Sequence, residues 1–156
     1  MLNNVLPTEE LSGLARARAR NYETKTVNAA LVEQMVAEGW AVDKSNKKSV
    51  RLRRPKAHGT LLEDRVWTLL YRMQFLFLSG QGGAQLNLTP KDEKSAESQI
   101  DVVAIDNEVA IAIECKSSEE HSRRPQFQQE LGKHTLIREP IISGCPAGYQ
   151  PGDTRK

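Results

Sequence analysis

Two apolar segments joined by a short polar turn restrict the fold of this chain more than any other feature. Residues 99–105 and 109–116 are rich in Val, Ile and Ala, and the Asp106-Asn107 pair between them is typical of a tight turn. The pattern predicts an antiparallel β-hairpin. If Asp106 lies opposite Val109, counting outward places Asp101 opposite Glu114. The hairpin therefore brings two carboxylates together at its open end.

Alternation along the second segment separates its side chains into two faces, because successive residues of a strand point to opposite sides of the sheet. The apolar face contains Val109, Ile111, Ile113 and Cys115, so we expect Cys115 in the core rather than as a nucleophile. The other face contains Ala110, Ala112, Glu114 and Lys116. Like charges directly opposite each other destabilise a sheet, and a bound divalent cation would explain the pair of acids.

The residue types at the open end suit a magnesium site. Mg²⁺ prefers oxygen ligands and is usually held by one or two carboxylates, with water and substrate phosphate completing its shell. Asp101 and Glu114 would supply the carboxylates, and Lys116 would orient the attacking water or offset charge on the phosphate. We therefore expect phosphodiester hydrolysis with Mg²⁺ or Mn²⁺. The alternative is a charged hairpin end with a surface salt bridge worth ~0–1 kcal/mol.

Apolar periodicity predicts the elements around the hairpin. Helices are expected at 8–21, 27–38, 61–74 and 125–135, with Gly39 ending the second. Strands are expected at 40–42, 50–52, 75–78 and 140–143, with a strand fragment at 86–88 inside a polar loop. These elements divide the chain into a helical and hairpin segment (1–57), an α/β core (58–143) and an unstructured tail (144–156).

The segment Ser98-Gln99-Ile100-Asp101, followed after twelve residues by Glu114-Cys115-Lys116, resembles the motif of the PD-(D/E)XK nuclease superfamily, although the proline of the motif is missing. The resemblance implies an αβββαβ restriction-endonuclease-like core, with a mixed sheet flanked by helices. This is the order already predicted for residues 60–143. It further implies that Asp101, Glu114 and Lys116 form the catalytic centre.

In many such nucleases a glutamate on the first core helix helps to bind the metal, and this position corresponds to Glu63. Thr60-Leu61-Leu62-Glu63 is also a capping-box sequence, in which Glu63 would only bond the backbone at the helix start. Both interpretations stay open. Some members use a glutamine on the following helix, for which the candidates are Gln126, Gln128 and Gln129. Two other acidic-x-Lys triplets, Glu23-Thr24-Lys25 and Asp92-Glu93-Lys94, lie in polar segments and are expected to be chance matches.

Basic residues are concentrated in one short stretch, although the net charge of the chain is only +2. We expect this run to contact DNA phosphates. Its members are Lys44, Lys47, Lys48, Arg51, Arg53, Arg54 and Lys56. A second basic series, Arg16, Arg18 and Arg20, lies in the first expected helix. The alternative for the run is a solvated face without a partner.

Composition excludes several other classes of protein. Two cysteines cannot build a disulfide scaffold, and no Cys/His spacing resembles a zinc site. No apolar run approaches the length of a membrane span, and the N-terminus lacks the features of a secretory signal. We therefore expect a cytoplasmic protein that binds DNA and no membrane, with a homodimer left open.

These observations together predict a Mg²⁺-dependent DNA endonuclease, acting in defence or repair. The alternative is a catalytically silent DNA-binding or sensing module of the same fold, as the N-terminal part of a larger protein, because function depends on the site and not on the fold.

Overall fold

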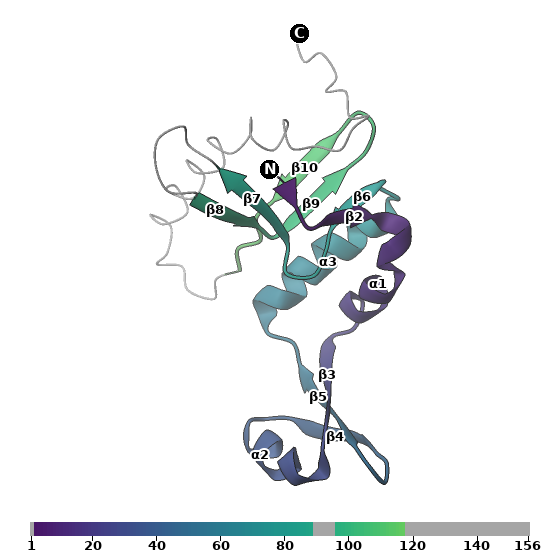
Figure 1. Cartoon of the computed structure of the whole chain (residues 1–156), viewed down its shortest axis with the longest axis vertical. Helices are drawn as coiled ribbons and strands as arrows, with labels where there is room; N and C mark the ends of the chain where they lie inside the picture. The colour runs from purple at the N-terminus through teal and green to yellow at the C-terminus, as the bar shows by residue number, and fades with distance from the viewer. Residues whose placement is uncertain (1, 89–95, 118–156) are drawn as a thin grey trace.

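The computed structural model describes residues 2–88 and 96–117, which form an α/β protein with antiparallel sheets and three α-helices (Figure 1). The elements in chain order are β1 (Leu2–Asn3), β2 (Val5–Pro7), the 3₁₀ turn η1 (Thr8–Leu11), α1 (Ser12–Arg18), β3 (Tyr22–Val27), the 3₁₀ turn η2 (Ala29–Leu31), α2 (Val32–Ala37), β4 (Ala41–Ser45), β5 (Val50–Pro55), α3 (His58–Arg72), β6 (Phe77–Ser79), β7 (Ala84–Leu88), β8 (Ala96–Ile100), β9 (Val102–Ile105) and β10 (Ala110–Ile113). No helix in this part of the chain is both long and apolar enough to cross a membrane.

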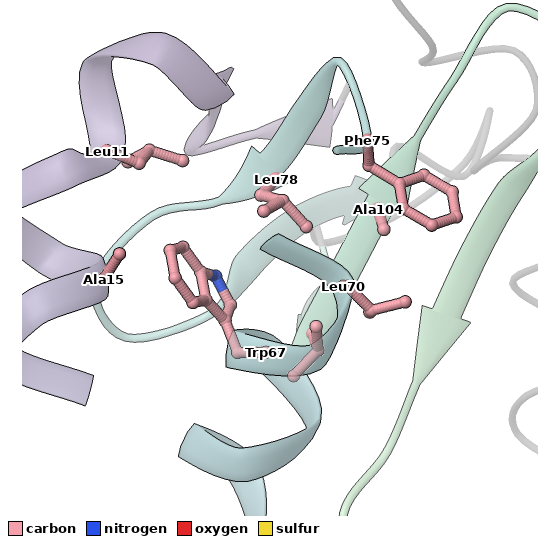
Figure 2. Close-up of a cluster of buried hydrophobic side chains, with 8 residues drawn as sticks. Leu11, Ala15, Trp67, Leu70, Phe75, Leu78 and Ala104 are labelled. Atoms are coloured by element: carbon pink, nitrogen blue, oxygen red, sulfur yellow. The ribbon is translucent and has the colours of Figure 1, made fainter. Parts of the chain in front are cut away.

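The central sheet has the strand order β10-β9-β6-β2, and helices α1 and α3 cover one of its faces. Trp67 of α3 is fully buried there and packs with residues of α1, β6 and β9 (Figure 2). The buried members of this cluster are Leu11, Ala15, Trp67, Leu70, Phe75, Leu78, Val102 and Ala104. Burial of each large side chain contributes about 1.5–3 kcal/mol, so this cluster fixes α3 against the sheet.

A second sheet, β1-β7-β8, lies against the other face of the central sheet. Two extended segments each supply one strand to both sheets. Asn4, which has a φ of 58°, separates β1 from β2, and Asp101 separates β8 from β9. The cluster between the sheets consists of Ala84, Leu86, Ile100, Val103 and Ile105, with Ala110 and Ala112 packed against it. Both faces of the predicted hairpin are therefore covered, and Asp101 lies at the point where its strand passes from one sheet to the other.

Residues 22–55 form a projection that we call the arm. The arm is a three-stranded sheet of order β3-β5-β4 with α2 on one face, and its small core contains Val27, Met35, Trp40, Val50 and Leu52. Figure 1 shows the arm extending from the ends of α1 and α3, away from the central sheet.

Most of the predicted elements are present in the described residues, with shifted limits. The helices expected at 8–21, 27–38 and 61–74 correspond to η1–α1, η2–α2 and α3, and Gly39 has the positive φ of a helix stop. Trp40 and Trp67 are both buried core residues. Strands β1, β2 and β3 were not predicted, and the strand expected to reach Lys116 ends at Ile113. The helix expected at 125–135, the strand at 140–143 and the tail lie outside the described residues, so the αβββαβ arrangement remains a prediction.

The turn between β6 and β7 imposes a strict backbone requirement at Gly83. Gly83 has a φ of 80°, and a Cβ there would overlap the carbonyl oxygen of Ile100. We expect Gly83→Ala to destabilise the fold by at least ~1 kcal/mol, because both the left-handed conformation and the overlap are unfavourable. Gly13→Ala is the control, since nothing lies within 4 Å of a Cβ at that helical position. Urea unfolding monitored by tryptophan fluorescence measures both variants, and equal stabilities would contradict the requirement.

Candidate active site

The register of the central hairpin agrees with the sequence prediction. Strands β9 and β10 pair from Ala110↔Ile105 to Ile113↔Val102, and the backbone N–H of Asp106 donates to the carbonyl of Val109 at 2.8 Å. The next position outward in this register pairs Asp101 with Glu114. The two acids proposed from the sequence therefore follow the last pair of the ladder, on neighbouring chain segments.

Asp101 is fixed by the backbone of the opposite segment. Its Oδ2 accepts a hydrogen bond from the backbone N–H of Cys115 at 2.7 Å. Repulsion between opposed carboxylates would by itself make Asp101 destabilising. The hydrogen bond changes that expectation, because removal of the acceptor would leave the N–H of Cys115 without this partner. Asp101 thus has a structural role in addition to its proposed role as a ligand.

Glu114 and Lys116 follow β10 in a segment without regular secondary structure. The Nζ of Lys116 lies 2.6 Å from the Oε1 of Glu114, and the side chains are 44% and 22% exposed. An ion pair this exposed contributes only ~0–1 kcal/mol, so it does not lock either group in place. The lysine expected to act beside the metal thus lies in direct contact with one of the two proposed ligands.

Glu63 lies on α3, near the acids of the hairpin. The helix begins at His58 with Ala57 as its N-cap and no side-chain cap, so Thr60 is inside the helix and the capping-box interpretation is wrong. The pKa of Glu63 is raised by burial and then by repulsion from Asp101, while Arg18 acts in the opposite direction. Asp64 and Glu114 add smaller repulsions. Glu63 thus shares a local concentration of negative charge with both hairpin acids.

Cys115 faces the core, as the alternation predicts. It packs with Ile111 and Ile113 against the cluster that contains Trp67. Burial raises the pKa of its thiol to about 11, with further repulsion from Asp101, Glu63 and Glu114. Because the thiolate is the nucleophilic form, this thiol is unreactive near neutral pH.

A cleft of about 420 Å³ opens beside Asp101 and Glu63. Its walls come from four parts of the chain: α1 with the start of β3, Lys56 with the first turns of α3, the turn between β6 and β7, and the end of β8 with Asp101. The polar residues that line it include Arg18, Arg20, Thr24, Lys56, Gln81 and Gln99, and Tyr22 is its aromatic residue. The cleft therefore joins the acidic end of the hairpin to the base of the arm.

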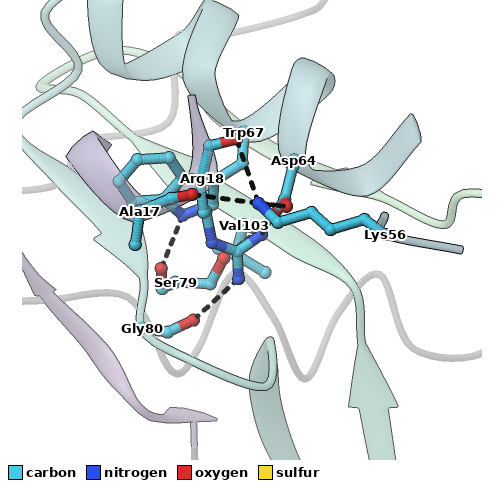
Figure 3. A network of polar contacts seen from close by, with 8 residues as sticks. All are labelled: Ala17, Arg18, Lys56, Asp64, Trp67, Ser79, Gly80 and Val103. Atoms are coloured by element: carbon cyan, nitrogen blue, oxygen red, sulfur yellow. Dashed lines mark hydrogen bonds and ion pairs between the residues drawn. The ribbon is translucent and has the colours of Figure 1, made fainter. Parts of the chain in front are cut away.

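A largely buried ionic network forms one wall of the cleft (Figure 3). Asp64 of α3 accepts from Arg18 at 3.1 Å and from Lys56 at 2.7 Å, and these three side chains are only 8–9% exposed. Lys56 also donates to the carbonyl of Ala17 at 2.9 Å, at the C-terminal end of α1. Arg18 lies over the ring of Trp67, with 5.1 Å from its Cζ to the ring centroid. The network thus joins α1, α3 and the base of the arm.

The basic run predicted to contact DNA occupies several environments. Lys44, Lys47, Lys48, Arg51 and Arg53 are exposed. Arg54 donates to Glu23 at 2.7 Å and lies over Trp40, so it contributes to the packing of the arm. Lys56 differs from the exposed members of the run, because its ammonium is enclosed in the Asp64 network. It is therefore unsuited to contact DNA phosphates. Of the two triplets expected to be chance matches, the first contains Glu23, which pairs with Arg54. The second, residues 92–94, lies outside the described residues. The candidate glutamines Gln126, Gln128 and Gln129 lie outside them as well.

The donor chemistry fits a hard divalent cation, although the carboxylates are not already gathered around one point. Within residues 2–88 and 96–117, no three Asp, Glu, His or Cys side chains converge as a preformed metal cage. Mg²⁺ needs only one or two protein carboxylates, because water and phosphate oxygens complete its shell. Asp101, Glu114 and Glu63 offer oxygen ligands only, and their mutual repulsion favours a nearby cation.

Comparison with protein-family models, with curated proteins and with solved structures finds no match for this chain.

We expect Mg²⁺ to raise the melting temperature, because a ligand that binds only the folded state stabilises it, by about 2.7 kcal/mol at one hundred times its Kd. The Asp101→Asn variant should lose this response while keeping an acceptor for the N–H of Cys115.

The pKa of Glu63 is raised on folding, so the metal-free protein should lose stability as pH rises from the ordinary glutamate range through that raised value. The gain from Mg²⁺ should grow over the same interval, because binding requires the ionised carboxylate. Thermal scans with and without Mg²⁺ at several pH values provide the measurement, and a melting temperature that Mg²⁺ leaves unchanged would count against the site.

Proposed function

We propose that this protein is a Mg²⁺-dependent DNA endonuclease with a PD-(D/E)XK type of centre, acting in defence or repair. One observation supports it above the others: Asp101 and Glu114 follow the last pair of a hairpin whose first strand is buried, and Glu63 of α3 shares their electrostatic environment. Three acids from three chain segments, two of which border the cleft, are difficult to explain by folding alone, since clustered like charges oppose folding. They are what a site for a cation and a phosphate requires.

In the proposed mechanism, Asp101 and Glu114 would hold the cation, and Glu63 would complete the carboxylate set. Bound Mg²⁺ would polarise the scissile phosphate and make a water molecule more acidic. Lys116 has a compact ammonium beside Glu114, and it orients that water or offsets the negative charge that develops on the phosphate. The backbone N–H of Cys115 orients the Asp101 carboxylate, so the ligand is directed by the fold before any cation binds.

A second function is favoured by a different observation. Lys116 already neutralises Glu114, and no preformed three-ligand cage exists in the described part of the chain. A catalytically silent DNA-binding or sensing module would have the same fold and keep this ion pair permanently. The two functions differ in one measurable property, which is Mg²⁺-dependent cleavage.

Cleavage of supercoiled plasmid DNA tests the choice between them. With Mg²⁺ the wild type should convert the plasmid to nicked and linear forms, and Glu114→Ala should lose this activity because it removes a ligand. The matched control is Glu108→Ala, which removes the same charge from an exposed position at the other end of the same hairpin. Agarose gels of time courses with Mg²⁺ and with EDTA give the result. A wild type that cleaves neither this plasmid nor circular single-stranded DNA, or a Glu114→Ala variant as active as Glu108→Ala, would reject the proposed nuclease.

Lys116→Ala should separate binding from chemistry, because the lysine is not a proposed ligand. Single-turnover cleavage should slow by roughly 10²–10³-fold, as expected when a preorganised electrostatic group is removed, while the stabilisation by Mg²⁺ is retained. Lys116→Arg should rescue the rate only in part, since a planar guanidinium has a different reach. If the loss in rate of Lys116→Ala matches a loss in DNA affinity, the lysine has no part in the chemical step.

A further inference from the structure

The arm has one packed face and one open face. Val27, Val50 and Leu52 point toward α2 and are buried with Met35 and Trp40. Alternation places the intervening residues on the opposite face, where their side chains are exposed to solvent. This open face consists of Tyr22, Thr24 and Thr26 of β3, Arg51 and Arg53 of β5, and Ala41 and Lys44 of β4. The open face is polar and basic, and each of these side chains is exposed.

The register of the arm orders these residues along the face. Thr24 pairs with Arg53, Thr26 pairs with Arg51, and Lys44 pairs with Arg51 from the other side. The three cations therefore lie next to one another, with the two threonine hydroxyls beside the arginines. Asp43 lies at the bulge of β4 and accepts from Arg51 at 2.6 Å, while Arg53 is 4.0 Å away. One carboxylate against three cations leaves the face with a surplus of positive charge.

The open face leads into the cleft of the candidate active site. Tyr22 and Thr24 line that cleft together with Asp101 and Glu63, whereas Thr26 and Arg51 lie beyond it on the arm. The distance along β3 from Tyr22 to Thr26 is about 13 Å at ~3.3 Å per residue. A row of an aromatic ring, hydroxyls and cations therefore extends from the acidic end of the hairpin onto the arm.

The combination matches the chemistry of single-stranded nucleic acid binding, in which cations follow the backbone and an aromatic ring stacks on a base. Tyr22 is 39% exposed, so one side of its ring is accessible to a base. The cleft, at about 420 Å³, has the size of a site for one small ligand, where a base pair held inside a duplex could not enter. Gln81 and Gln99 line it. The Nε2 of Gln99 donates to the carbonyl of Gly82 at 2.9 Å, which leaves its amide oxygen and the amide of Gln81 to bond the edge of an unpaired base.

We infer that the open face of the arm and the cleft together bind an unpaired DNA strand, with Tyr22 stacked on a base and Arg51, Arg53 and Lys44 on the phosphates. The inference rests on the proposed nuclease function and names its substrate class: single-stranded DNA, or the unpaired strand at a junction with a duplex. Arg54 and Lys56 have no part in this surface, because Arg54 lies on the packed face over Trp40 and Lys56 is enclosed in the Asp64 network.

Binding measured in EDTA tests the inference independently of cleavage. Fluorescence anisotropy of a labelled oligothymidine and of a duplex of equal length should show tighter binding of the single strand by the full chain. The Arg51→Gln/Arg53→Gln variant should lower the slope of log K against log salt by about 1.4, at ~0.7 for each phosphate contact with a single strand. Tyr22→Ala should weaken binding about 5- to 150-fold, the effect of one lost stacking contact, and Tyr22→Phe should restore it.

The matched control is Arg65→Gln/Arg72→Gln, which removes the same charge from exposed positions on α3 and should leave the slope unchanged. Equal or tighter binding of the duplex, an equal effect of the two double variants, or no effect of Tyr22→Ala would overturn the inference. Single-strand binding by a protein that cuts no DNA would instead reject the nuclease and leave the binding surface standing.

Discussion

The arrangement of the described residues depends on one buried carboxylate. Asp64 holds Arg18 at the end of α1 and Lys56 before α3, so the two chain segments that lead into and out of the arm meet at one point. Loss of one partner from a buried ionic group is costly, typically 3–5 kcal/mol, because the remaining charge has no compensation. The network therefore determines where the arm leaves the core. It also fixes the turn of α3 that contains Glu63.

The interruption of a strand at Asp101 serves both fold and site. If β8 and β9 formed one continuous strand, alternation would place the side chain of Asp101 beside those of Val103 and Ile105, between the two sheets. At the break, the carboxylate can accept from the backbone of Cys115 and border the cleft. Gly83 makes room for the break at Asp101, since a Cβ there would overlap the Ile100 carbonyl, and Gly80 likewise makes room for the side chain of Asn4 at the other interruption. Small residues there permit the geometry that directs the acid.

The hairpin register was predictable because its alternation and its turn are both local in sequence. Asp101, Glu114 and the face of Cys115 followed from these two signals. Strand β3 was missed, since Tyr-Glu-Thr-Lys-Thr-Val has little apolar content, and its six pairs with β5 stabilise it instead. No sequence pattern predicted the ionic network of Asp64, because its partners Arg18 and Lys56 are 46 and 8 residues away in the chain. Which residues of the basic run share a face of the arm could not be predicted, because the bulge at Asp43 changes the alternation of β4 and is visible only in the structure.

The two ends of the proposed strand path have opposite charge, and this difference separates attachment from chemistry. A phosphate is attracted to Arg51 and Arg53 on the arm, whereas Asp101, Glu63 and Glu114 repel it at the end of the hairpin. Without a cation at the acidic end, a strand can remain attached to the arm while its backbone stays away from the carboxylates. Neutralisation of those carboxylates would remove a repulsion that salt screens beyond ~8–10 Å. On the proposed function, DNA binding by the arm would need no metal, whereas the approach of the scissile phosphate would. The short length of β3 between Tyr22 and Thr26 would let one DNA strand reach both sites.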